Sequence, residues 1–245
     1  MIPGDNPNIF QTQNYSVGYE EPVLQNISLK FSSPGVVGII GNNGKGKTTL
    51  LKSLCGLLKP SGGKIIFNDT DIYSVTNGER AKLISLNFSS NNISFPISVY
   101  ELVSMGRYPY TNHWAGLSQN DKKIIDEALE LCQVKNFKDK FITGLSDGEK
   151  QKVFIAKLIA QQTPIMLFDE PTAFLDYSSK KYYFQLMKKI ATEQQKIILI
   201  SSHDIDFLTA YTDELVMIED DETVVCGTTN EIMKSDYFKK HFTKL

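Results

Sequence analysis

The chain has 245 residues, a length that allows one large domain or a core domain with a smaller domain inserted into it. Hydrophobic residues make up 41% of the sequence, which together with 16 glycines is an ordinary globular composition and excludes the disordered and fibrous classes. The 26 Lys and Arg residues nearly balance the 28 Asp and Glu residues. The formal net charge of −2 lacks the basic excess that drives non-specific binding to phosphate backbones, so no nucleic-acid partner is expected.

No segment of the sequence predicts a membrane span or an export signal. The longest apolar runs, such as Leu215 to Ile218, have only four residues, whereas a membrane-spanning helix needs about 20. Met1 to Asn8 lacks both the basic and the apolar region of a secretory signal. Cys55, Cys132 and Cys226 are odd in number and widely spaced, which fits neither a disulfide framework nor a zinc site. We therefore expect the protein in a reducing cytosol.

Short apolar segments predict two kinds of sheet. Within the first 30 residues, the strand-like pieces Tyr15 to Tyr19 and Ile27 to Phe31 flank the turn signal Glu20-Glu21-Pro22, which predicts a small antiparallel sheet. Four later segments rich in Val and Ile are continuously apolar, which predicts parallel strands buried on both faces. They are Val36 to Ile40, Leu83 to Leu86, Ile165 to Phe168 and Ile197 to Ser201.

Between Asn87 and Gln162 the strand pattern disappears and helical periodicity takes over. The candidate helices there are Val99 to Met105, Asp121 to Cys132 and Glu149 to Gln161. The sequence therefore predicts one α/β unit over residues 1–245. It has a mostly parallel sheet, a small N-terminal antiparallel sheet and a helical subdomain inserted at residues 87–162.

Gly41 to Thr48 read Gly-Asn-Asn-Gly-Lys-Gly-Lys-Thr and fit the phosphate-loop pattern G-x-x-x-x-G-K-[ST]. The segment follows a predicted strand and precedes a helix that starts near Thr48. Glycines let successive backbone N–H groups converge on an anion, and the helix N-terminus adds partial positive charge. The pattern predicts a phosphate-loop (P-loop) NTPase core, in which Lys47 contacts the terminal phosphates and Thr48 ligates Mg²⁺. Lys45 is a second cation where such loops usually carry a small residue, and its side chain can simply point into solvent.

Asp169 and Glu170 end a predicted apolar strand at the edge of the sheet where ligands of open α/β folds bind. We expect Asp169 to hold magnesium through a water and Glu170 to polarise the attacking water. Such a pair alone is as often a helix cap or a solvated turn. His203 follows the next predicted strand at the same edge, so we expect it to contact the γ-phosphate and orient the water. His113 and His241 have no carboxylate or cysteine partner at ligand spacing.

Leu145 to Gln151 read Leu-Ser-Asp-Gly-Glu-Lys-Gln and open a helix whose apolar positions follow helical spacing. Ser146 and Glu149 form a capping box, so this segment can serve a purely structural purpose. Its position shortly before Asp169, in a chain that carries a phosphate loop, favours a functional role.

Here the sequence resembles the ATP-binding subunits of ABC transporters, whose LSGGQ signature appears as Leu-Ser-Asp-Gly-Glu. The resemblance runs from Tyr15 to Met233. It implies that ATP and Mg²⁺ bind, and that two copies enclose two ATP molecules head to tail, the signature helix of one facing the γ-phosphate held by the other. It also implies that opening and closing of the pair drives integral membrane permease subunits, with the cassette peripheral to the cytoplasmic face of the membrane. The matching residues are Tyr19, stacking on adenine; Gly41, Asn42, Asn43, Gly44, Lys45, Gly46, Lys47, Thr48 and Thr49 of the phosphate loop; Ser146 and Gly148 of the signature; Asp169 and Glu170, the magnesium and catalytic carboxylates; Asp176 of the D-loop; and His203, the switch histidine.

Two segments depart from the family pattern. Leu86 to Asn92 contain no glutamine where the family carries one. Asn87, Ser89 and Ser90 have a shorter reach, which weakens the expectation of magnesium contact and coupling through this loop. Asp147 replaces a glycine of the signature, and we expect its side chain to point away from the phosphate because Ser146 and the backbone N–H groups are retained.

The stretch Val99 to Pro109 resembles the V-x-E-L-V-x-x-G-R-x-P segment of importers for iron-siderophore, haem and cobalamin complexes. It lies where the membrane subunit docks in that family. We expect Val103, Met105 and Tyr108 to supply a hydrophobic cleft with Arg107 at its rim. The alternative is that these residues are ordinary subdomain core.

Two other function classes compete with a transporter subunit. A soluble ABC ATPase acting in cluster assembly or nucleic-acid repair usually shows coiled-coil insertions, two cassettes in one chain or a basic face, which this sequence lacks. A phosphate-loop GTPase or small-molecule kinase would leave Ser146 to Gln151 unexplained, and the guanine-reading N-K-x-D motif is absent. The sequence therefore favours a single ABC cassette that hydrolyses ATP to power uptake of an iron chelate or a cobalamin-like compound.

Overall fold

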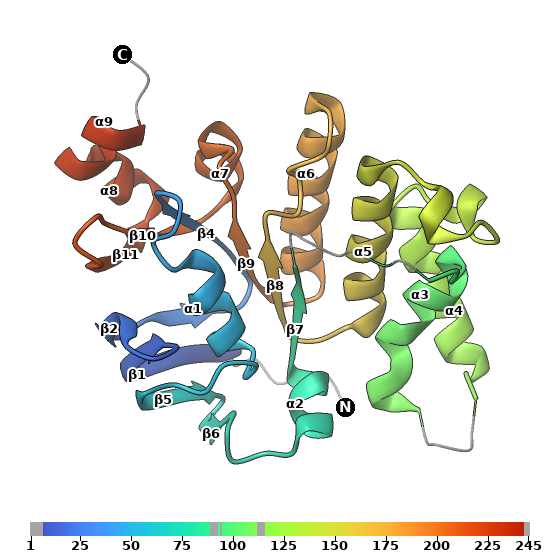
Figure 1. Cartoon of the computed structure of the whole chain (residues 1–245), viewed down its shortest axis with the longest axis horizontal. Helices are drawn as coiled ribbons and strands as arrows, with labels where there is room; N and C mark the ends of the chain where they lie inside the picture. Colours follow the sequence, from blue (N-terminus) through green and yellow to red (C-terminus); the bar gives the residue numbers. More distant parts are fainter. Residues whose placement is uncertain (1–6, 89–92, 94, 112–115, 243–245) are drawn as a thin grey trace.

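The structure, a computed structural model, describes residues 7–88, 93, 95–111 and 116–242. It contains two sheets, with three packed helices beyond one edge of the larger sheet (Figure 1). The smaller sheet has five strands in the order β2-β1-β5-β6, with β3 also paired to β1, and its pairs are antiparallel. Its strands are β1 (Ile9–Gly18), β2 (Pro22–Ile27), β3 (Lys30–Ser32), β5 (Gly62–Phe67) and β6 (Thr70–Asp71).

The larger sheet has six strands in the order β11-β10-β4-β9-β8-β7, and only the β10–β11 pair is antiparallel. Side chains of one strand alternate between two cores: Val36 and Ile40 pack with the helices of one face, whereas Val37 and Ile39 pack between the two sheets. Strands covered on both faces are continuously apolar, so the predicted α/β fold is confirmed. The strands are β4 (Gly35–Gly41), β7 (Ile84–Asn87), β8 (Ile165–Asp169), β9 (Ile197–Ser201), β10 (Glu214–Ile218) and β11 (Val224–Thr228).

Most helices begin at a side-chain cap that the sequence encodes. Capping boxes start α2, α3, α4, α5 and α8, each with a Ser or Thr cap and an acidic residue three positions later. Helix α1 contacts the smaller sheet, α6 and α7 pack on β4, and α3, α4 and α5 pack on one another next to β7. None of the helices in the described ranges is both long and apolar enough to cross a membrane. The helices are α1 (Lys47–Leu54), α2 (Asn77–Leu83), α3 (Val99–Ser104), α4 (Gln119–Leu131), α5 (Asp147–Gln161), α6 (Tyr177–Glu193), α7 (Ile205–Tyr211), α8 (Thr229–Lys234) and α9 (Asp236–Phe242), with 3-10 turns η1 (Met105–Tyr110), η2 (Lys135–Phe137) and η3 (Ile142–Gly144).

The smaller sheet differs from its prediction. The predicted strand Ile27 to Phe31 is wrong, because β2 ends at Ile27 and β3 begins at Lys30, and the two strands pair with different parts of β1. The Thr12 hydroxyl bridges this break: it donates to the Ile27 carbonyl (3.2 Å) and accepts from the Leu29 amide (2.9 Å). Strand β1 is also longer than predicted, and β5, β6, β10 and β11 were missed.

Arg107 is in the interior, so its predicted place at the rim of a cleft is wrong. The residue is 5% exposed, and its guanidinium donates to the Asp121 carboxylate and to the Ala160 carbonyl, both at 2.8 Å. The same group lies 4.2 Å from the ring centroid of Tyr110. Arg107 therefore joins η1, α4 and α5 and is too buried to present its guanidinium to a docking partner. The position of Arg107 in the sequence motif does not indicate that it pairs with Asp121 in the interior.

Gly106 is required where η1 crosses α5. A Cβ atom at this position would lie 2.4 Å from the Lys157 carbonyl oxygen and 3.2 Å from the Gln161 amide nitrogen. We predict that Gly106→Ala lowers the free energy of unfolding by about 1–3 kcal/mol, the usual cost of overpacking. Urea unfolding measures this, with Gly116→Ala as the control because no atom of the described residues lies within 4 Å of a Cβ there. Equal stability of the two variants would contradict the close approach.

Candidate active site

The phosphate loop connects β4 to α1 and is shaped by its glycines. Gly44 and Gly46 adopt positive φ angles of 79° and 94°, which favour glycine. The Lys47 ammonium folds back over the loop and donates to the carbonyls of Gly41 (2.6 Å) and Asn42 (3.3 Å). Burial lowers the pKa of Lys47, and the carboxylates of Glu170 and Asp169 oppose that shift. The loop thus presents backbone donors and one cation, which together can hold a polyphosphate.

Asp169 lies next to the loop and joins it to the centre of the sheet. In the parallel pairing of β8 with β9, Asp169 is opposite Ser201. The Asp169 carboxylate accepts from the Thr48 hydroxyl (2.8 Å) and from the Ser201 hydroxyl (2.7 Å), and the residue is 2% exposed. A hydroxyl and a carboxylate at this distance are oxygen donors of the kind that magnesium takes. A role for Ser201 was not predicted. The signal that could have indicated it is a hydroxyl residue at the end of a predicted strand, next to a strand that ends in Asp169.

Glu170 turns out of the sheet toward His203. Its φ of 49° ends β8, and its amide donates to the Ser201 carbonyl (3.1 Å) and hydroxyl (3.2 Å). The His203 amide donates to one oxygen of the Glu170 carboxylate (3.2 Å), and the His203 Nε2 lies 3.3 Å from the other. Burial raises the pKa of Glu170, and His203 opposes the shift. A partly buried carboxylate next to an exposed histidine can accept a proton from a bound water.

Lys45 and Asn42 hold the outside of the loop to the β10–β11 turn. Lys45 does not extend freely into solvent, because its ammonium donates to the Asp220 carbonyl at 2.7 Å. The Asn42 side-chain amide donates to the Asp220 carboxylate at 2.8 Å, and this bond lowers the pKa of Asp220. Asp220 was not predicted, because no local pattern connects it to a loop 178 residues away.

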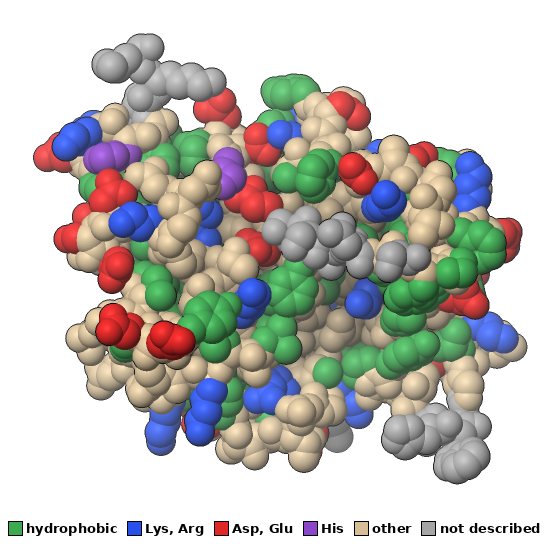
Figure 2. Space-filling view, in the orientation of Figure 1, with side chains coloured by type: hydrophobic (Ala, Val, Ile, Leu, Met, Phe, Trp, Pro, Cys, Tyr) green, Lys and Arg blue, Asp and Glu red, His purple; other side chains and the backbone are tan. Residues whose placement is uncertain are grey.

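The sequence-predicted site residues fall into two groups. The structure brings together the phosphate loop with Thr48 and Thr49, the strand-end carboxylates Asp169 and Glu170, and His203. Figure 2 shows acidic, basic and histidine side chains close together beside α1. The signature helix α5 lies on the far side of β7 and β8 from α1 (Figure 1). Ser146 and Gly148 at its N-terminus therefore sit outside the cluster around Lys47, whereas Tyr19 contacts α1 through Lys52 and Asp176 is at the start of α6.

Each residue of the second group has a defined local setting. Tyr19 follows β1, is 66% exposed, and its hydroxyl accepts from the Lys52 ammonium at 3.4 Å. Ser146 forms the predicted capping box: its amide donates to the Glu149 carboxylate at 2.8 Å. The Asp147 carboxylate accepts from Lys150, and Asp176 caps α6 by accepting from the Ser179 amide. Asn87 is buried at the end of β7, whereas Ser89 and Ser90 lie outside the described residues, as does His113.

Comparison with known proteins decides the family. A model described as "ABC transporter" matches residues 24–173. The chain belongs to the ABC transporter family, as one of its ATP-hydrolysing cassettes. It is 32% identical over 218 residues to a petrobactin import ATP-binding protein of Bacillus subtilis, which covers 89% of this chain and 86% of that protein.

Other relatives extend the comparison. A cobalamin import ATP-binding protein of Halobacterium salinarum is 29% identical over 220 residues; the match covers 90% of this chain but only 55% of that protein. The dimeric structure of a bacterial ABC transporter cassette, solved also in a post-hydrolysis state with ADP and Pi, superposes with a TM-score of 0.79 at 25% identity. That match covers 90% of this chain and 98% of the other. The cluster around Lys47 is accordingly the candidate ATP site of this ABC cassette.

Proposed function

We propose that this cassette hydrolyses ATP to power import of an iron chelate or a cobalamin-like compound through a separate integral membrane permease, from the cytoplasmic face of the membrane. The relatives named for petrobactin and cobalamin import support the substrate class. The observation that carries the proposal is a partly apolar groove past the C-terminal end of α1, which we propose receives a permease segment. The single cassette spans residues 1–245, with 87–162 as its helical subdomain.

The groove has a volume of about 420 Å³ and runs between the end of α1, helix α2 and strand β7. Leu57 is 65% exposed at this groove, and Tyr108 on the neighbouring η1 turn is 60% exposed. Hydrophobic side chains line the hollow between α2 and α3 in Figure 2. The cleft expected from Val103, Met105 and Tyr108 is not formed by those residues: Val103 is fully buried in the core of the helices, Met105 is partly buried against that core, and Tyr108 is the exposed member. Apolar side chains gathered in a polar surface mark an interaction site.

In the proposed reaction, Lys47 leaves the Gly41 and Asn42 carbonyls and contacts the terminal phosphates of ATP. Thr48 and Asp169 would hold Mg²⁺, since their paired oxygens fit that ion. When bound there, the ion would offset the negative charge of the phosphates. Glu170 accepts a proton from the water whose oxygen attacks the γ-phosphorus as the bond to ADP breaks, and His203 orients that water. Tyr19 stacks on adenine.

The proposed active form contains two copies of the chain. The 15-residue helix α5 carries its positive partial charge at Ser146 and Gly148, which are remote from the phosphate loop of the same copy. A second copy turned head to tail would present this helix end to the γ-phosphate, with Asp176 and its neighbours at the contact between copies. The dimeric ABC cassette at TM-score 0.79 supports a two-copy form.

We predict that Glu170→Gln keeps ATP binding but lowers the rate of phosphate release by about 10²–10⁴-fold, because the amide cannot accept the proton. The amide oxygen can still accept from the His203 backbone, so the local fold is preserved. The variant should also accumulate as an ATP-bound dimer on size exclusion. The exposed Glu222→Gln is the control for the loss of one negative charge. Normal turnover in Glu170→Gln would remove Glu170 from the mechanism.

The docking groove is tested with Leu57→Asp. We predict that this variant hydrolyses ATP within about twofold of the unsubstituted chain, since Leu57 is an exposed surface residue. It should no longer co-purify with a multispanning membrane protein from membranes of the cells that make both subunits, because a buried unpaired charge is costly. Met233→Asp is the control, since Met233 is also exposed but belongs to α8, which lies away from α2 and β7 (Figure 1). Undiminished co-purification of Leu57→Asp would contradict docking in this groove.

A further inference from the structure

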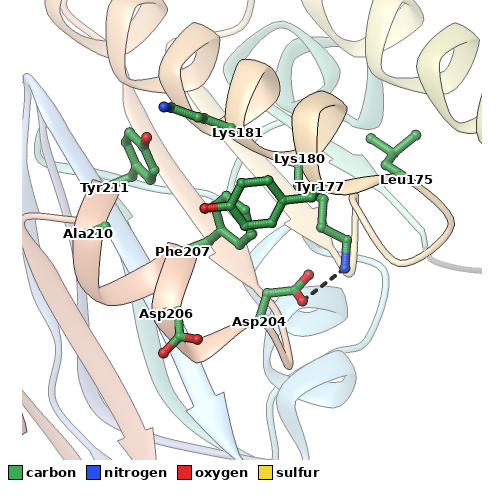
Figure 3. Close-up of a pocket in the computed structure, with 9 residues that line it drawn as sticks. All are labelled: Leu175, Tyr177, Lys180, Lys181, Asp204, Asp206, Phe207, Ala210 and Tyr211. Carbon is green, nitrogen blue, oxygen red and sulfur yellow. Dashed lines mark hydrogen bonds and ion pairs between the residues drawn. The ribbon is translucent and has the colours of Figure 1, made fainter.

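An ion pair closes the space between α6 and α7, next to the ATP site. The Lys180 ammonium lies 2.9 Å from the Asp204 carboxylate, and the two side chains are only 20% and 27% exposed. Figure 3 shows the pair at one side of a pocket of about 440 Å³, with the Tyr177 and Phe207 rings beside it. Those rings pack 5.2 Å apart between centroids, so the ion pair sits against a partly apolar wall.

The positions of the two residues connect two parts of the site. Lys180 lies one helical turn after Asp176, the residue that caps α6 by accepting from the Ser179 amide at 2.8 Å. Asp204 directly follows His203. The ion pair therefore ties the N-terminal turn of α6 to the short segment that carries His203.

The remaining bonds of Asp204 fix that segment on both sides. Its second carboxylate oxygen accepts from the hydroxyl of Thr172, at 3.4 Å, and Thr172 is 1% exposed and two residues beyond Glu170. The Asp204 amide donates to the Ser202 hydroxyl at 3.1 Å. The His203 amide, between these two residues, donates to the Glu170 carboxylate at 3.2 Å. A shift of Asp204 would move this donor relative to Glu170.

We propose that Lys180 and Asp204 are positioning residues for ATP hydrolysis, whose ion pair holds His203 against the Glu170 carboxylate. Neither side chain touches Glu170 in the structure, so both act through the backbone around His203. The inference rests on the proposed roles of Glu170 and His203. Partly exposed ion pairs contribute little to stability, whereas small displacements in an active site can lower a rate about 10²-fold. The pair should therefore matter more for turnover than for folding.

Lys181 provides the matched control. It is the next residue of α6 and lines the same pocket, and within the described part of the chain it has no acidic partner in ion-pair distance. Lys181→Met removes the same charge from the same helix and leaves the Lys180–Asp204 pair in place. Lys180→Arg keeps the charge and can still reach Asp204, so it is the conservative variant.

The test is steady-state ATP hydrolysis, with the Kd for ATP and the melting temperature measured in parallel. Lys180→Met should lower kcat about tenfold while KM and Kd for ATP stay within about twofold of the unsubstituted values. Lys180→Arg should recover most of the lost kcat. Asp204→Asn should lower kcat in the same way, and the double variant Lys180→Met/Asp204→Asn should be no slower than either single variant. Lys181→Met should behave like the unsubstituted chain.

Three results would overturn the proposal: unchanged kcat in Lys180→Met, an equal loss in Lys181→Met, or additive losses in the double variant. If Lys180→Met fails to fold, Asp204→Asn serves as the test variant, because Asn has nearly the same side-chain size as Asp. The proposed function is tested separately by Glu170→Gln. If Glu170→Gln is inactive and Lys180→Met is fully active, only the positioning role fails; if Glu170→Gln turns over normally, the catalytic assignment itself fails.

Discussion

Parallel pairing of β4, β9 and β8 is the constraint on which the candidate ATP site depends. In this register Ile39, Ser201 and Asp169 lie opposite one another across the three strands. The residues that follow each strand must then emerge at one edge of the sheet. Gly41 and the phosphate loop leave β4 there, Glu170 leaves β8, and His203 leaves β9. Pairing of the strands is therefore enough to bring together three segments that are far apart in the sequence.

Burial on both faces of the larger sheet keeps this edge fixed. Alternate residues of β4 pack in two different cores, one with helices α6 and α7 and one with the smaller sheet and α1. A slip of one residue would exchange the two sets of side chains and displace Asp169 from Thr48 and Ser201. The hydrogen bonds of the Asp169 carboxylate therefore depend on the register of the strands. Burial of the apolar side chains in the two cores fixes that register.

The sequence was most informative where a motif of functional residues directly follows a predicted apolar strand. The phosphate loop could be located from Gly41 to Thr48 alone, because a glycine-rich turn between a buried strand and a helix is typical of phosphate binding. The strand-end carboxylates and His203 followed from the same buried strands. The break between Ile27 and Lys30 could not be predicted, because it depends on the Thr12 hydroxyl of another strand. The burial of Arg107 and the contact of Lys45 with Asp220 likewise depend on residues distant in sequence.

One copy of the chain does not contain a complete proposed site, because α5 lies across β7 and β8 from α1. The most direct measurement of this claim mixes two variants, Lys47→Ala and Ser146→Arg, and follows ATP hydrolysis. Each variant alone should be inactive. An equal mixture should regain about a quarter of the unsubstituted rate, because half of its dimers pair an intact phosphate loop with an intact signature helix at one of two sites. A mixture that stays inactive, or full activity of Ser146→Arg alone, would contradict a site shared between two copies.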